Sequence, residues 1–178
     1  MAEILDIVNE KDEIIGQMER EEVHAKGLIC RMVFVLFYTP DKQIILQRRS
    51  LSKKSNPGRL TTTVSGHVES GATYDETAAK ETLEESGISV ELSDLTNLGV
   101  LYAGYTEGDY ISNAVRGLYL YEFKGSVDDL KIEAGEGEGF ESISIDEFWR
   151  RRSETPDDLS LYLLDELGAK MIQTIEAL

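Results

Sequence analysis

One helix is marked at both of its ends by the sequence, and this helix limits the folds that are open to the chain. Thr73 followed by Glu76 forms a capping box, which begins a helix. Gly87 suits the left-handed position just after a helix ends. The two signals predict a helix over residues 73–86.

The last turns of this helix carry carboxylates that repel one another. Glu81, Glu84 and Glu85 lie three and four positions apart, so each neighbouring pair costs about 0.2–0.5 kcal/mol. Each anion also costs about 0.3–1 kcal/mol at the negative end of the helix dipole. We expect Ala79 and Leu83 to form an apolar stripe on the opposite face. A hard cation with oxygen ligands would turn the repulsion into attraction, so the pattern indicates a metal site.

Strands are predicted on both sides of this helix. Apolar, β-branched and aromatic runs occupy residues 31–38, 43–49, 61–68, 98–104 and 115–123. Two helices are predicted at 144–152 and 156–178, and residues 133–139, EAGEGEG, read as an acidic glycine-rich loop. Because strands and helices alternate without a linker, we expect one α/β domain over 1–178, a sandwich with a mixed β-sheet.

Charge and hydropathy exclude several classes of partner. The formal net charge of −16 repels nucleic acids and anionic membranes. No apolar stretch approaches the roughly 20 residues of a membrane helix, and the N-terminus lacks a basic start followed by an apolar core. A cytoplasmic protein is expected. The single cysteine, Cys30, lies in an apolar run and is expected to be a buried thiol.

A basic segment stands out against this acidic background. Within the stretch QRRSLSKKSNPGRL lie Arg48, Arg49, Lys53, Lys54 and Arg59. The segment is either a solvated basic loop or an anion site, because arginine and lysine hold phosphate through charge-assisted hydrogen bonds.

Residues 66–88, GHVESGATYDETAAKETLEESGI, resemble the Nudix box, G-x5-E-x7-R-E-U-x-E-E-x-G-U, where U is a bulky apolar residue. The matching positions are Gly66, Glu81, Glu84, Glu85, Gly87 and Ile88, and the departures are Ala72, Lys80 and Thr82. The resemblance implies a Nudix-type α/β/α sandwich. It also implies a hydrolase that cleaves the diphosphate linkage of a nucleoside diphosphate derivative or a similar X-linked diphosphate.

The resemblance also implies roles for particular residues. Glu81, Glu84, Glu85 and the carbonyl of Ser65 would bind Mg2+ or Mn2+, with Glu84 and Glu85 also taking part in catalysis. Glu138 is a candidate base from outside the box. The family's isomerase-like branch implies that Arg49 and Lys53 hold the diphosphate. Lys80 keeps the charge of the family's arginine, and a homodimer is an assembly that the family allows.

Two alternatives stay open at this point, a non-catalytic ligand-binding Nudix domain and an isopentenyl diphosphate isomerase. Ser65 stands where that isomerase has its catalytic cysteine, and Ser112 and Ala114 stand where it has a Glu-x-Glu. Of its two N-terminal metal-binding histidines, one is retained as His24 and the other is replaced by Arg31. His24 and His67 are either functional or inherited hydrogen-bonding residues. The tyrosines able to stack on a base are Tyr105, Tyr110 and Tyr119, although packing is the more common role of such residues.

Overall fold

The computed structural model describes residues 3–132 and 134–178, so Glu133 of the glycine-rich segment lies outside the described residues. The first half contains β1 (Ile4–Val8), β2 (Ile14–Glu19), α1 (Arg20–Lys26), β3 (Ile29–Tyr38), β4 (Ile44–Arg49), β5 (Leu60–Thr61), β6 (Val64–His67) and α2 (Tyr74–Ser86). The second half contains η1 (Leu92–Asp94), β7 (Leu95–Glu107), β8 (Tyr110–Glu122), η2 (Val127–Asp129), β9 (Gly137–Ile143), α3 (Ile145–Glu154), η3 (Pro156–Asp158), α4 (Leu161–Leu164) and α5 (Glu166–Ala177).

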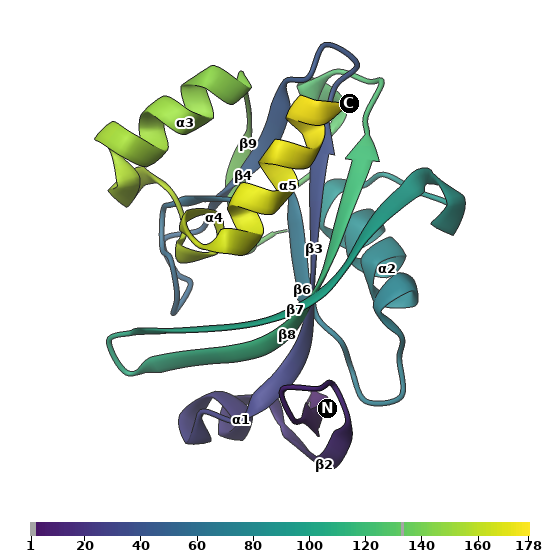
Figure 1. Cartoon of the computed structure of the whole chain (residues 1–178), viewed down its shortest axis with the longest axis vertical. Helices are drawn as coiled ribbons and strands as arrows, with labels where there is room; N and C mark the ends of the chain where they lie inside the picture. The colour runs from purple at the N-terminus through teal and green to yellow at the C-terminus, as the bar shows by residue number, and fades with distance from the viewer. Residues whose placement is uncertain (1–2, 133) are drawn as a thin grey trace.

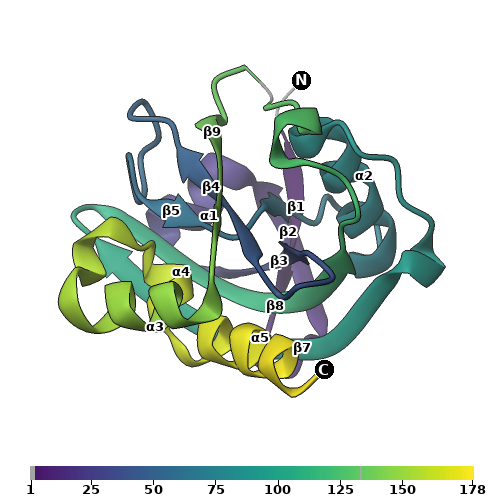
Figure 2. The same ribbon diagram turned by 90° about the horizontal axis from the view of Figure 1, so that it is seen from above.

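A mixed sheet with helices on both faces forms the body of the described structure (Figures 1 and 2). Its main path is β5-β4-β3-β8-β7, while β6 pairs with β3 and β9 pairs with β4. Strand β3 runs parallel to β8 and antiparallel to β4 and β6. β1 and β2 form a separate two-stranded sheet. The predicted α/β sandwich with a mixed sheet is confirmed.

Strand β3 explains why there are two cores. Its side chains alternate between the two faces of the sheet, and nearly every one of them is buried. Val33, Val35 and Phe37 pack in the cluster that includes Ala78 of α2. Phe34 and its neighbours in the alternation pack in the other cluster, with residues of α3, α4 and α5. A strand buried on both faces forces the three-layer arrangement.

The ends of α2 are as predicted, but the face that it buries is not. Glu76 Oε2 accepts hydrogen bonds from the backbone and side chain of Thr73, which completes the capping box, and Gly87 has a φ of 73°. The predicted apolar stripe is wrong, because Leu83 is 51% exposed. The helix instead buries Ala78 together with several polar side chains, and these include the carboxylate of Glu85.

The predicted helix over 156–178 is broken into η3, α4 and α5. Asp165 ends α4 and caps α5, because its Oδ1 accepts from the backbone N–H groups of Leu167 and Gly168. Its Oδ2 accepts a 2.5 Å hydrogen bond from Arg116 of β8. This long-range ion pair fixes the break, and a local sequence pattern cannot show it.

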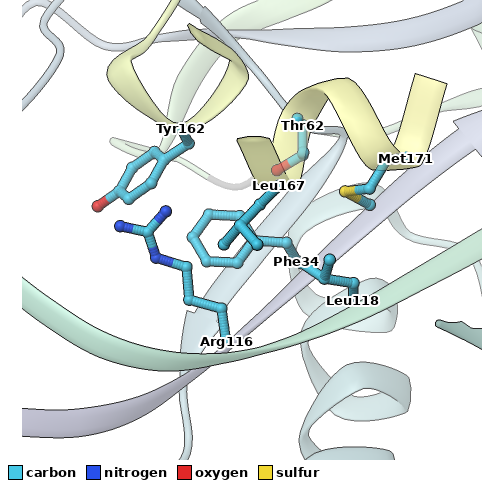
Figure 3. Close-up of a pocket in the computed structure, with 8 residues that line it drawn as sticks. Phe34, Thr62, Arg116, Leu118, Tyr162, Leu167 and Met171 are labelled. Atoms are coloured by element: carbon cyan, nitrogen blue, oxygen red, sulfur yellow. The ribbon is translucent and has the colours of Figure 1, made fainter. Parts of the chain in front are cut away.

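Arg116 is almost completely buried between the sheet and the C-terminal helices (Figure 3). Its guanidinium carbon lies 4.9 Å from the ring centre of Tyr162 and 5.6 Å from that of Phe34. Asp165 and the two rings therefore hold one buried cation under the sheet.

The nearby Cys30 is buried as expected, and burial raises the pKa of its thiol to about 12.

A long hairpin, β7 and β8, extends from the sheet (Figure 1). The strands predicted at 98–104 and 115–123 are longer than expected, so the segment between them is mostly strand, with the turn at Gly108 and Asp109. Within the described residues β7 pairs only with β8, so it forms an outer edge where Val100, Leu101 and Tyr102 are exposed.

No helix in the described part of the chain has the length and apolar character that crossing a membrane requires.

Candidate active site

A cleft of about 1470 Å³ lies at one end of the sheet. Its walls come from α1, the C-terminal half of α2, β6, the segment after β4 and the turn between β7 and β8. Among its ionisable residues are Arg20, His24, Arg49, Lys53, His67, Lys80, Glu81, Glu85 and Glu136. The cleft therefore combines carboxylates with cationic groups, as a site for a metal and an anionic ligand requires.

Glu85 is the buried carboxylate of this cleft. Its side-chain Oε2 accepts hydrogen bonds from Ser65 N at 3.3 Å and from Gln47 Nε2 at 3.4 Å. Burial, together with the negative charges of Glu136 and Glu81, raises the pKa of Glu85 to about 8, and burial is the largest of these causes. A divalent cation would reverse this penalty, because it stabilises the ionised form.

Glu81 lies against β6, and this close approach requires a glycine. A Cβ atom at Gly66 would lie 2.4 Å from the carboxyl carbon of Glu81, which is too short for any side chain. Because Ser65 precedes Gly66, the packing brings Glu81, Glu85 and Ser65 to one place in the cleft. Carboxylate and carbonyl oxygens are the ligands that Mg2+ prefers, so these three residues fit the metal that the sequence implies.

Glu84 is placed differently from the other two glutamates. Its side chain is 47% exposed and does not line the cleft. Its Oε2 atom lies 3.6 Å from Nζ of Lys80. In the described part of the chain no three acidic, histidine or cysteine side chains already converge as a metal site. The three glutamates therefore differ in exposure, since Glu81 and Glu85 line the cleft and Glu84 does not.

Lys80 holds several of these carboxylates through one ammonium group. Its Nζ lies 2.9 Å from Glu69 and 3.9 Å from Glu81, besides its contact with Glu84. Lys80 therefore links Glu69, outside the helix, to two of the helix glutamates.

Lys80→Arg is expected to leave the turnover rate unchanged or to raise it by up to about 3-fold, because a planar fork holds carboxylates in fixed orientations while the charge is kept. Steady-state kinetics and a metal titration of both proteins measure this. A clear loss of rate would show that the lysine has a role of its own.

The basic segment divides into structural and cleft-lining residues. Arg48 pairs with Asp158 at 2.8 Å and Glu141 at 3.3 Å, and Arg59 lies 3.6 Å from Glu107. Arg49 and Lys53 line the cleft, as an anion site requires. Arg49 Nε donates to the Ser55 carbonyl. Lys54 lines the cleft rim and is largely exposed.

The glycine-rich segment supplies a different glutamate from the one expected. Glu138 is exposed and does not line the cleft, whereas Glu136 does. The reason is a β-bulge, because Gly139 pairs with Arg48 while Gly137 pairs with Arg49, which leaves Glu138 as the extra residue. A sequence with alternating glycines and glutamates carries no signal for the position of such a bulge.

Two histidines lie together at the inner wall of the cleft. His24 Nδ1 lies 2.9 Å from the Ile111 carbonyl, so this nitrogen donates. His24 Nε2 then accepts from His67 Nε2 at 3.0 Å and from the Tyr110 hydroxyl at 3.3 Å. Burial lowers the pKa of both imidazoles, that of His67 well below its usual value, so both rings are neutral.

The three tyrosines have separate positions. The ring of Tyr110 stacks on His24 with centres 4.7 Å apart, and it lines the cleft. Tyr105 donates to Ser55, while Tyr119 is buried on the α2 side of the sheet, where its hydroxyl donates to Asp75. Tyr110 is thus the one of the three that reaches the cleft.

Comparisons with known proteins agree on one family. A sequence model described as NUDIX domain matches residues 29–164. A Clostridium acetobutylicum protein named as an uncharacterized Nudix hydrolase is 28% identical over 151 residues, which cover 83% of this chain and 73% of the relative. An isopentenyl-diphosphate Delta-isomerase of Serratia proteamaculans is 25% identical over 176 residues, with 97% of this chain and 96% of the relative covered. Several other curated Nudix hydrolases match over about half of their own length.

The crystal structure of a Deinococcus radiodurans protein has a TM-score of 0.71 at 24% identity, with 97% of this chain and 99% of that one covered. This likeness shows that the two proteins share a fold.

Proposed function

Because the chain belongs to the Nudix family of hydrolases, we propose that it is a divalent-metal-dependent enzyme that cleaves the diphosphate linkage of a nucleoside diphosphate derivative or a similar small molecule. The observation that carries this proposal is Glu85, a buried carboxylate whose pKa is raised to about 8 beside Glu81 and Ser65. Such a group is poorly solvated without a cation, and it faces a cleft that also contains Arg49 and Lys53.

The residues divide the work between metal and substrate. Glu81, Glu85 and the Ser65 carbonyl would hold Mg2+ or Mn2+. Glu84 would contribute negative charge to the metal site from the exposed side of the helix, where its carboxylate contacts the Lys80 ammonium group. The metal would supply neutralisation of the phosphate oxygens and activation of a water molecule. Arg49 and Lys53 would bind the diphosphate, and a cleft carboxylate would accept the proton of the attacking water.

The rival activity is isomerisation of an isopentenyl diphosphate, since a relative with that name aligns over 97% of this chain. The position of the isomerase's catalytic cysteine is Ser65 here, whose backbone N–H donates to Glu85. A serine hydroxyl has a far higher pKa than a thiol, so it does not supply the same proton transfer. Hydrolysis is therefore the function that these residues support better.

A turnover screen tests the proposal. The protein is incubated with nucleoside diphosphate derivatives, nucleotide sugars, dinucleotides and isoprenoid diphosphates, with Mg2+, with Mn2+ and with a chelator. Metal-dependent release of monophosphates supports hydrolysis. A moved double bond without phosphate release would identify an isomerase, and binding without turnover would identify a ligand-binding domain.

The cytoplasmic location, the single domain and the homodimer stay predictions.

A further inference from the structure

Lys53 and Glu136 form a close ion pair in the wall of the cleft. The Lys53 Nζ atom lies 2.5 Å from Oε1 of Glu136, with side chains 24% and 30% exposed. Both residues line the cleft that contains Glu81 and Glu85. The ammonium group that is expected to bind a substrate phosphate is therefore already bound to a carboxylate of the same chain.

The backbone holds Glu136 in place while its side chain can turn. Its carbonyl accepts a 3.1 Å hydrogen bond from Ser50 N, which ties it to the segment that carries Lys53. Gly135 and Gly137 flank it, so its neighbours in the chain contribute no side chain beside the carboxylate. The backbone hydrogen bond to Ser50 does not involve the ion pair, so Glu136 and Lys53 can separate through their side chains while this bond stays intact.

Glu136 lines the same cleft as Glu81 and Glu85, and its charge acts on Glu85. Its negative charge is the largest charge contribution that raises the pKa of Glu85, ahead of that of Glu81. Lys53 offsets part of this repulsion as long as the ion pair is intact. If another anion bound Lys53, its ammonium group would no longer offset the negative charges of Glu136, Glu81 and Glu85.

We propose that Glu136 occupies Lys53 in the substrate-free enzyme and that a substrate phosphate displaces it, which releases a third carboxylate toward Glu81 and Glu85. The inference rests on the proposed function, because it takes a diphosphate as the ligand of Lys53. A carboxylate and a phosphate make the same charge-assisted hydrogen bonds to an ammonium group, and the phosphate brings more charge. Binding of a phosphate at Lys53 would then raise the affinity of the site for the metal ion, and binding of the metal ion would raise the affinity for the phosphate.

The first test measures anion affinity without metal or turnover. Methylenediphosphonate, a diphosphate that resists hydrolysis, is titrated calorimetrically in the presence of a chelator. Glu136→Gln is expected to bind it about 3- to 10-fold more tightly than the wild type, because the internal competitor has lost its charge and the pair is partly screened by solvent. The matched control is Glu138→Gln, which removes the same charge two residues away outside the cleft and is expected to leave the affinity unchanged.

The second test measures cation affinity without the anion. Lys53→Met should tighten Mn2+ binding, followed by electron paramagnetic resonance, and this gain should disappear in the Lys53→Met, Glu136→Gln double variant. Unchanged or weaker diphosphonate binding by Glu136→Gln would overturn the exchange, as would an equal gain in Glu138→Gln. If the wild type hydrolyses diphosphates but Glu136→Gln binds no tighter, only the exchange fails. If binding tightens but nothing is hydrolysed, only the proposed function fails.

Discussion

Glu85→Gln is expected to reduce metal-dependent turnover by at least about 100-fold while the protein stays folded. The substitution removes the charge of the buried carboxylate at nearly constant volume, and its contacts with Ser65 and Gln47 can be kept through the remaining oxygen. Steady-state kinetics at limiting and saturating Mg2+ measure the effect. Glu84→Gln is the matched comparison, because it removes the same charge from the exposed neighbour, and its loss should be at least ten times smaller. Full activity of Glu85→Gln at limiting metal would rule out Glu85 as a ligand.

The same variant should be more stable than the wild type in the absence of metal. Burial raises the pKa of Glu85 from 4.5 to about 8 on folding, so its protonated form is favoured in the folded state. The stability that this group contributes is complete below pH 4.5 and is lost as the pH rises toward 8. At pH 7 the wild type is therefore destabilised by about 1–3 kcal/mol, and the glutamine removes this penalty. Thermal unfolding with a chelator should show a larger gain at pH 8 than at pH 5, and equal gains would contradict the assigned cause.

Arg49→Ala is expected to raise the KM by about 10- to 150-fold with little change in kcat. The guanidinium lines the cleft, and one charge-assisted contact with the diphosphate would be lost. Lys53→Ala should raise the KM less, because it also removes the need to displace Glu136. Kinetics with the substrate found in the turnover screen check both values.

Metal titration of the free protein is the control for this prediction. Removing a nearby cation cannot weaken the binding of another cation, so Mg2+ affinity should be unchanged or higher in both variants. An unchanged KM in Arg49→Ala and Lys53→Ala would show that the basic segment is a solvated loop and not an anion site.

Local signals in the sequence predicted local structure correctly. The two ends of α2 depend on Thr73, Glu76 and Gly87, whose capping hydrogen bonds are made to residues of the same helix. The burial of β3 on both faces follows from its apolar run, since a strand buried on both faces reads as continuous hydrophobicity. The positions of Arg49 and Lys53 in the cleft followed from a resemblance to a known family, because spacing alone left a solvated loop as an equal reading.

Features set by distant contacts could not be predicted. Burial of Glu85 in preference to Leu83 depends on Gln47 and Ser65, which lie on other strands. The choice between Glu136 and Glu138 depends on one bulge in β9. A shift of one residue in register exchanges the two faces of a strand, and the energies that set it come from the partner strand.

The exposed edge at β7 has a consequence for how the protein behaves in concentrated solution. From Thr96 to Thr106 the strand contains no charged residue and no proline, and its bulge near Asn97 protects only one end. Natural edge strands are commonly guarded by charges, because an open ladder of N–H and C=O groups accepts foreign strands. Here colloidal stability depends on the net charge of −16 carried by the rest of the surface. As the pH falls toward the isoelectric point near 4.5, that repulsion vanishes, and we expect aggregation by strand addition at β7.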